Sequence, residues 1–424
     1  MFLTLGRTDD ALTQFQDCLK ISRTLAEADP RDAQKQRDLS VSFDRLGNVF
    51  LTQGRTDDAL TQFQDCLKIR RALAEADPRD AQKQRDLAIS FDKLGNVFLT
   101  LGRTDDALTQ FQEYAKMCRT LAEADPRDVQ MQRDLSVSFQ RLGDVFLKLG
   151  RTDDALTQFQ DHWKISRTLA EADPRDAQKQ RDLSISFDRL GNVFLTLGRT
   201  DDALTQFEDG LKIRRVLAEA DPRDAEKQRD LMVSHYNLGV VAVQTKRYDD
   251  ATRNFQEGIA VLDRLIANGQ SVEDSQKVKA ILQQRLQFST VAKLAIGDWD
   301  TLLKVDAQVL PQLLVLRATE MLKRGELANA VQATDKLREL EPKDKNNLYN
   351  AACVYAQCAA LVIKDKPTPT DAEQAERQKF IKLALDTLKD SLAAGYDNFA
   401  HMQKDDDLKP LRGLPEFEAL FPKE

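Results

Sequence analysis

Side chains that could carry out acid–base or metal chemistry are few and scattered in this chain of 424 residues. The three histidines, His162, His235 and His401, lie far apart in the sequence, and the five cysteines form no paired C-x-x-C motif. The glycine-rich phosphate loops and the H-E-x-x-H zinc motif are also missing from the sequence. We therefore expect no enzymatic activity, no cofactor and no metal.

One acidic pair recurs, because Asp57-Asp58 and its counterparts follow Arg-Thr in each copy of a repeated segment. Paired carboxylates could bind a metal or transfer protons. Acidic residues in the first turn of a helix are also stabilised by its dipole, and Thr56 is placed to cap that helix. We interpret the pairs as helix-start residues. The basic run from Lys68 to Arg71 lies among acidic residues, so we interpret it as a solvated face with ion pairs rather than a phosphate site.

His162 stands where an earlier copy has Cys66, and His235 stands where its sister copies have phenylalanine. We interpret both as repacked interior positions, with a ligand or peptide contact at His162 as the alternative. Cys18, Cys66 and Cys118 belong to the helix that follows Arg-Thr-Asp-Asp and lie on or near its apolar face. All five cysteines, these three with Cys353 and Cys358, are expected to be reduced core residues of a cytosolic protein.

These residues are carried by near-identical units that begin at Gly6, Gly54, Gly102, Gly150 and Gly198, at intervals of 48 residues. A fixed period of about 20–50 residues is typical of stacked repeats.

Each unit divides into two amphipathic helices. The first follows Arg-Thr-Asp-Asp, and the second contains a Leu-Gly pair, as in Leu94-Gly95. Pro78, between them, suits the first position of the second helix. Gly95 in mid-helix indicates a close approach of two helices, since glycine there is about 1 kcal/mol less favourable than alanine.

Leu94-Gly95, Phe98, Gly102, Ala107 and Phe111 fall at the signature spacings of the tetratricopeptide repeat, and the chain resembles that family. The unit is about 14 residues longer than the usual unit of about 34, which corresponds to roughly two extra turns per helix. Extended repeats of this kind resemble those of the kinesin light chain. The resemblance implies an all-α fold, an α-α superhelix of antiparallel helix pairs, with helices of roughly 20 residues.

We predict four regions: an array of extended repeats over residues 1–270 with an incomplete first repeat, a degenerate helical repeat over 271–310, two further repeats over 311–396, and a capping segment over 397–424. Because the chain starts within a repeat, its first long helix lacks the usual partner. We favour the interpretation that the chain is the later part of a longer protein. The alternative is that another copy or another molecule covers this helix, as in a homo-oligomer. The last segment is similar to the end of tetratricopeptide regions in large bacterial signalling proteins.

In the family that the chain resembles, the helix with the Leu-Gly pair lines a concave groove. The resemblance implies that the peptide-binding positions are Asp44, Asn48, Asp92, Asn96, Gln140, Asp144, Asp188 and Asn192. Residues four apart stack on one face of a helix, and amides can pair with the backbone of an extended peptide. The carboxylates favour a basic partner. Chaperone-binding members of the family hold the C-terminal carboxylate of their partner with lysines and asparagines. Here aspartate replaces the expected lysine, so we do not predict that contact. The alternative is that asparagine is simply common on helix surfaces.

A patch on the other helix differs between copies: Cys18-Leu19, Cys66-Leu67, Tyr114-Ala115, His162-Trp163 and Gly210-Leu211. This variation either tunes partner choice or curvature, or reflects neutral repacking.

A net charge of −7 does not favour nucleic acid or an anionic membrane as a partner, and no apolar run is long enough to cross a bilayer. We predict a cytoplasmic, non-enzymatic scaffold that binds a peptide or protein in its groove. One alternative is the regulatory part of a larger bacterial signalling enzyme, such as a Ser/Thr kinase or protease. Another is a self-assembling module.

Overall fold

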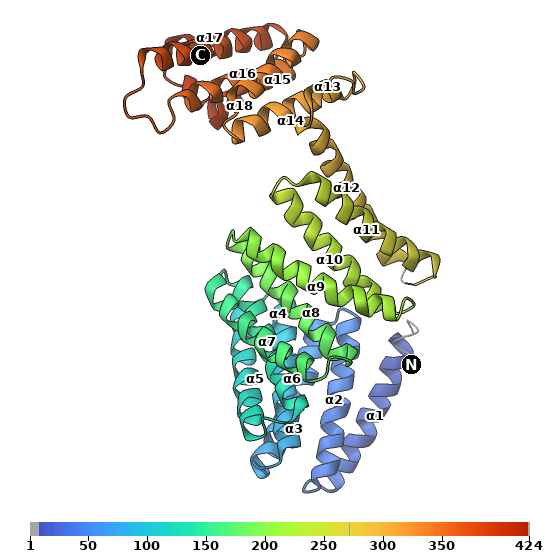
Figure 1. Ribbon diagram of the computed structural model, residues 1–424. Helices are drawn as coiled ribbons and strands as arrows, with labels where there is room; N and C mark the ends of the chain where they lie inside the picture. The colour runs from blue at the N-terminus through green and yellow to red at the C-terminus, as the bar shows by residue number, and fades with distance from the viewer. Residues whose placement is uncertain (1–7, 271, 423–424) are drawn as a thin grey trace. The chain divides into compact units, whose positions relative to one another are not determined.

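The computed structural model describes residues 8–270 and 272–422, and every regular element within these ranges is a helix (Figure 1). The long helices of the repeats are α1 (Thr8–Ala28), α2 (Ala33–Thr52), α3 (Thr56–Ala76), α4 (Ala81–Thr100), α5 (Thr104–Ala124), α6 (Val129–Lys148), α7 (Thr152–Ala172), α8 (Ala177–Thr196), α9 (Thr200–Ala220), α10 (Ala225–Gln244) and α11 (Tyr248–Ala267). Consecutive helices from α1 to α9 pack against each other as antiparallel pairs. The expected all-α solenoid and the helix lengths of 20 and 21 residues are confirmed.

The described residues belong to two compact units, Met1–Val241 with Val261–Val272, and Ala242–Ala260 with Glu273–Glu424. The second unit contains α12 (Val272–Ile296, whose first residue lies in the first unit), α13 (Trp299–Leu302), α14 (Leu310–Lys323), α15 (Leu327–Leu340), α16 (Lys345–Val362), α17 (Asp371–Ala393), α18 (Phe399–Lys404), the 3-10 helix η2 (Asp406–Leu411) and α19 (Pro415–Glu418). The predicted division into four regions remains a prediction. Among the described helices, none combines the length and apolarity that a membrane span requires.

The Leu-Gly pair occurs in α2, α4, α6, α8 and α10, which we call the Leu-Gly helices, and an aspartate side chain caps the start of each. Asp80 precedes α4, and its carboxylate accepts hydrogen bonds from the backbone N–H of Gln82 and Lys83 at 3.0 and 3.1 Å. Gly102 follows the helix with a φ of 73°, a left-handed conformation that glycine adopts without strain. The predicted place of Pro78 at the first helical position is wrong, because the helix begins at Ala81 and Asp80 supplies its cap.

The intervening helices start differently from the prediction. Thr56 is the first helical residue of α3 rather than its cap, and no side chain caps this end. Instead, Nε of Arg55 lies 2.7 Å from Oδ2 of Asp58 in the first turn. The acidic pair Asp57-Asp58 therefore lies at the helix start as expected, and one of its members binds the preceding arginine.

The glycine of the Leu-Gly pair marks the closest approach of two helices. A Cβ on Gly95 would lie 2.5 Å from Cε1 of Phe111, whose ring on α5 is fully buried. Gly47 has the same relationship to Phe63, at 2.8 Å. The predicted close contact is confirmed, and it recurs in each extended repeat from α2 to α9.

The second unit has a core of its own, which includes Leu313, Tyr355 and Met402. The rings of Tyr349 and Tyr396 stack with their centroids 4.4 Å apart. Residues 364–370 form a connection without helix between α16 and α17, as the prolines predicted.

Candidate functional site

The positions predicted to contact a peptide lie on one face of the Leu-Gly helices. Nδ2 of Asn48 donates to the backbone oxygen and to Oδ2 of Asp44, at 2.8 and 3.2 Å. Asn96 makes the same backbone contact with Asp92 at 2.8 Å. These side chains are half-buried, whereas Asn192 in the last of the four pairs is exposed. Members of a pair therefore lie over one another, and their part in peptide binding remains a prediction.

Most carboxylates of this face are bound by cations of the following repeat. Nε of Arg141 lies 2.8 Å from Oδ1 of Asp92, and Nη2 of Arg189 lies 3.2 Å from Oδ2 of Asp144. Burial raises the pKa of the Asp144 carboxyl, and the nearby arginines oppose that effect. The face therefore does not present a row of free negative charges, which removes the reason for expecting a basic partner.

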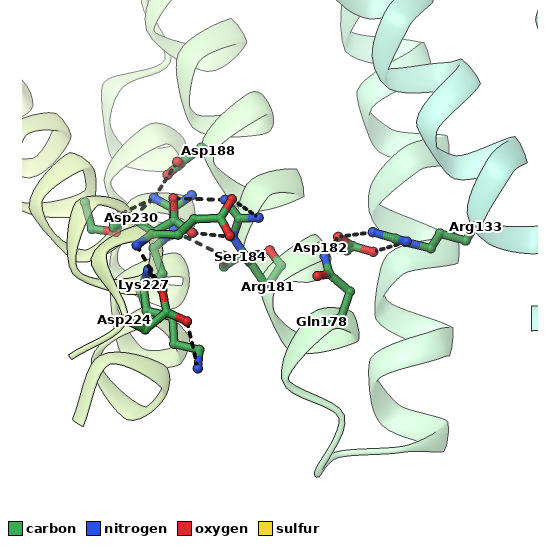
Figure 2. Close-up of polar contacts among 12 residues, drawn as sticks. Arg133, Gln178, Arg181, Asp182, Ser184, Asp188, Asp224, Lys227 and Asp230 are labelled. Carbon is green, nitrogen blue, oxygen red and sulfur yellow. Dashed lines mark hydrogen bonds and ion pairs between the residues drawn. The ribbon is translucent and has the colours of Figure 1, made fainter. Parts of the chain in front are cut away.

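A second row of ion pairs joins successive Leu-Gly helices near their N-terminal ends. Nε and Nη2 of Arg133 on α6 contact the carboxylate of Asp182 on α8 at 2.6 and 3.3 Å, and Gln178 also donates to that carboxylate at 2.8 Å (Figure 2). The same contact recurs at Arg37–Asp86, Arg85–Asp134 and Arg181–Asp230. We call these contacts the inter-repeat pairs. The neighbouring carboxylate raises the pKa of Arg133, which favours the charged guanidinium.

The inter-repeat pairs were not predicted from the sequence, although a recurring pattern of residues could have indicated them. Adjacent Arg and Asp residues, as in Arg85-Asp86, occur in each copy. Adjacent helical residues point about 100° apart. The arginine can therefore contact the aspartate of the next repeat, while its neighbouring aspartate contacts the arginine of the previous repeat.

Arg214 of α9, which contacts Asp188, is almost completely buried, with 3% of its surface exposed. Its Nε donates to Ser184 at 3.1 Å, and its Nη1 donates to Ser234 at 3.1 Å and lies 2.6 Å from Oδ2 of Asp188. Burial raises the pKa of Asp188, and Arg214 opposes this by favouring the charged carboxylate. Asp188, one of the predicted peptide contacts, is therefore buried and holds an internal arginine.

Arg70 of α3 occupies the equivalent place in an earlier repeat and is 7% exposed. It donates to Ser40 at 3.4 Å and to the backbone oxygen of Asp86 at 3.2 Å, but its Nη1 stays 3.9 Å from Oδ1 of Asp44. That Oδ1 atom is buried and has no hydrogen-bond partner. The residues at this position in successive repeats are Ser22, Arg70, Cys118, Ser166 and Arg214.

His162 of α7 is buried, which confirms the interior interpretation of this position. Its Nδ1 lies 2.8 Å from Oγ of Ser136, which in turn lies 3.0 Å from Oγ of Ser166. Burial lowers the pKa of His162 to about 4, so the imidazole is neutral at pH 7. Its Nε2 atom is buried without a hydrogen-bond partner.

Two hollows lie between neighbouring Leu-Gly helices. One, of about 220 Å³, lies between α2 and α4 over α3, and the other, of about 200 Å³, lies between α6 and α8 over α7. They occupy equivalent places, because Arg37 and Arg70 of the first correspond to Arg133 and Ser166 of the second. Both are smaller than the sites of about 300–1,000 Å³ that hold drug-sized ligands, so each suits a single side chain.

The cysteines do not form a reactive site in the described residues. Cys66 and Cys118 are buried as expected, and burial raises the pKa of the Cys66 thiol to about 11. The expectation for Cys18 is wrong, because this residue is exposed on α1.

One group in the second unit, Cys353, Asp405 and Asp407, brings possible metal-ligand atoms within 4.8 Å of one another. Asp405 is already used there, because its carboxylate accepts the Tyr349 hydroxyl at 2.7 Å and the N–H of Asp407 at 3.0 Å. These contacts explain the group as packing of the C-terminal segment.

Comparison with known proteins supports the repeat assignment. Residues 40–80 match the family model of the tetratricopeptide repeat, from within α2 to the cap of α4. The search of curated proteins gives no match. The crystal structure of BtubC from P. vanneervenii is 17% identical over 62% of this chain and 92% of its own, with a TM-score of 0.49.

Two further solved structures are also similar to the chain at low sequence identity. Apo RapI is 12% identical over 84% of this chain and 97% of its own, with a TM-score of 0.44. YrrB, described as a TPR protein with an unusual peptide-binding site, is 17% identical over 57% of this chain and 91% of its own, with a TM-score of 0.31. These likenesses are too distant to carry a functional argument.

Proposed function

We propose that this chain, whose 48-residue units are tetratricopeptide repeats with lengthened helices, is a non-enzymatic scaffold that binds a peptide or protein partner along its Leu-Gly helices. The observation that carries the proposal is the ordered row of amide and carboxylate side chains on these helices. Asn48 and Asn96 are each held by the residue four positions earlier, so their side chains are oriented before a partner arrives. Pre-orientation lowers the entropy that binding removes.

The polar row is suited to an extended backbone. An asparagine amide offers both donors and an acceptor, which matches the N–H and C=O groups of a peptide. Asn48 also accepts a hydrogen bond from Lys93 of the next repeat at 3.0 Å, so its side chain is held from both sides of a repeat boundary. Because Asp92, Asp144 and Asp188 are paired with arginines within the chain, selectivity is expected to come from the amides and the hollows.

Selection of peptides from a random library against the purified chain tests the proposal. The triple variant Asn48→Ala, Asn96→Ala and Asn192→Ala should weaken the selected peptides at least tenfold, or about 1.4 kcal/mol. A matched control replaces Thr61, Thr109 and Thr205 by alanine, since these residues are exposed on the intervening helices. Equal loss of affinity in both triple variants, or no selected peptides at all, would refute binding along this face.

A second candidate is self-association through α1. Ile21 and Leu25 are 62% and 51% exposed, whereas the equivalent Ile69 and Leu73 of α3 are half-buried. Contiguous exposed apolar side chains mark interaction surfaces. Light scattering over a concentration series should show an oligomer that Ile21→Gln with Leu25→Gln dissociates, and a monomer at every concentration would exclude it.

A further inference from the structure

We propose that the hollow over Arg70 binds a carboxylate group of the partner, an inference that rests on the proposed function of the same face. The hollow lies between α2 and α4 and has a volume of about 220 Å³, with Arg70 on its floor. Its lining side chains include three cations, Arg37, Arg70 and Lys83, and two carboxylates, Asp80 and Asp86. Arg37 contacts Asp86 at 2.7 Å and Lys83 contacts Asp80 at 3.2 Å, whereas Arg70 has no carboxylate closer than 3.9 Å in the described part of the chain.

Among the described residues, no carboxylate accepts a hydrogen bond from Arg70. Its nearest one, Asp44, stays at 3.9 Å without a hydrogen bond, and Oδ1 of Asp44 is itself buried and unpartnered. Nη2 of Arg70 has no hydrogen-bond partner among the described residues. A buried cation that is incompletely paired gains strongly from an anion, and a guanidinium binds carboxylates through parallel hydrogen bonds.

Arg214, at the equivalent position of a later repeat, is paired directly with a carboxylate. There the carboxylate of Asp188 lies 2.6 Å away, so the charge is neutralised inside the chain. The two repeats differ at the position four residues earlier on the helix, which is Cys66 in one and Gly210 in the other. A Cβ on Gly210 would lie 3.8 Å from Oδ1 of Asp188, so a larger side chain at this position lies against the carboxylate. We infer that Cys66 holds Asp44 away from Arg70 and leaves the arginine available.

The equivalent hollow over α7 gives the contrast within the same chain. It contains Arg133 and Lys179 as cations, and Asp176 and Asp182 as carboxylates. Ser166 replaces the arginine on its floor, so its charges balance. An acidic residue of an extended partner is thus expected at the Arg70 hollow and not at this one.

Fluorescence anisotropy with labelled hexaglutamate, amidated at its C-terminus, tests the inference on the full chain. Amidated hexaglutamine should bind at least tenfold more weakly than hexaglutamate. Arg70→Ser should weaken hexaglutamate at least tenfold, and the fold should tolerate this change because Ser22 and Ser166 occupy the same position in other repeats. Arg71→Ser removes the same charge from an exposed neighbouring residue and should change binding less than twofold. Hexaglutamine with a free C-terminus distinguishes a terminal carboxylate from a side-chain carboxylate.

Two further variants test the mechanism while Arg70 is kept. Cys66→Gly should let Asp44 close on Arg70 and weaken hexaglutamate at least fivefold. Asp44→Asn removes the competing charge and should tighten it. Binding that is unchanged in Arg70→Ser, or equal weakening by Arg71→Ser, would overturn the inference. So would a failure of hexaglutamate to bind, or unchanged binding in Cys66→Gly and Asp44→Asn. None of these results would affect peptides selected through the asparagine row, so the scaffold proposal would stand.

Discussion

Nη1 of Arg214 lies 2.6 Å from Oδ2 of Asp188, whereas the equivalent Arg70 stays 3.9 Å from Asp44 in an otherwise near-identical repeat. The shorter contact is a charge-assisted hydrogen bond, which is stronger and more directional than an ion pair without one. The same buried arginine and aspartate positions are therefore in direct contact in one repeat and separated in another. Comparing variants of the two repeats measures how much the direct contact contributes to stability.

Replacing Asp188 by alanine should be strongly destabilising, because Arg214 would be left buried without its carboxylate. Breaking a buried ion pair from one side typically costs about 3–5 kcal/mol. Asp44→Ala should lose less, since Arg70 is not bonded to that carboxylate. Urea unfolding followed by circular dichroism measures both variants, and equal losses would contradict the difference between the two repeats.

Two glycine substitutions should act in opposite directions. Gly95→Ala places a Cβ 2.5 Å from the buried ring of Phe111, and overpacking of this kind typically costs about 1–3 kcal/mol. Gly210→Ala meets no atom closer than 3.5 Å and should stabilise α9 by up to about 1 kcal/mol through helix propensity. Thermal unfolding of the two variants beside the parent chain checks the opposite signs. A stabilised Gly95→Ala variant would mean that the ring of Phe111 can move away from α4 without loss.

The repeat period made most of the fold predictable. Leu94-Gly95 and Phe111 recur at intervals of 48 residues, and this regularity fixes which helices must approach closely. Helix starts were harder to predict because several residues compete for the same backbone N–H groups. Asp80 caps α4 in place of Pro78 at its first position, and Arg55 binds Asp58 where Thr56 was expected to cap.

The candidate site was predictable in position but not in its contacts. The face that carries Asp92 and Asp144 follows from their place on the Leu-Gly helices. Their partners, Arg141 and Arg189, belong to the next repeat, and the period alone does not state which residue faces which across a boundary. Asp188 is paired with an arginine about four helix turns into the following helix, so no local pattern could reveal the contact.

Acid should destabilise the repeat that contains His162. Burial lowers the pKa of this histidine in the folded chain from 6.5 to about 4, so the folded state disfavours the protonated ring. The stabilisation is complete above pH 6.5 and is lost as the pH falls towards 4, by roughly 3 kcal/mol. The backbone of Ser136 and the more distant Asp182 favour protonation and Arg189 opposes it, but burial has the largest effect on the pKa.

The variant His162→Cys isolates that effect, because Cys66 occupies the same position in an earlier repeat. Its urea midpoint relative to the parent chain should rise as the pH is lowered from 7 to 4.5. A difference that stays constant over this range would show that the ring of His162 is accessible to protons in the folded chain.

The inter-repeat pair Arg133–Asp182 should couple neighbouring repeats more strongly than an ordinary surface ion pair. Its side chains are 38% and 21% exposed and share two contacts, whereas Arg151 and Asp154 within one helix start are about half exposed. Exposed pairs contribute about 0.2–1 kcal/mol, and screening is weaker for partly buried ones. A double-mutant cycle with Arg133→Ala and Asp182→Ala should therefore give a coupling near 1 kcal/mol that persists at high salt. The coupling energy from the Arg151–Asp154 cycle should be roughly a third of that value. It should disappear at high salt, because both charges are exposed to solvent and are screened by added ions. Equal couplings in the two cycles would mean that stacking of the apolar faces alone sets the register between repeats.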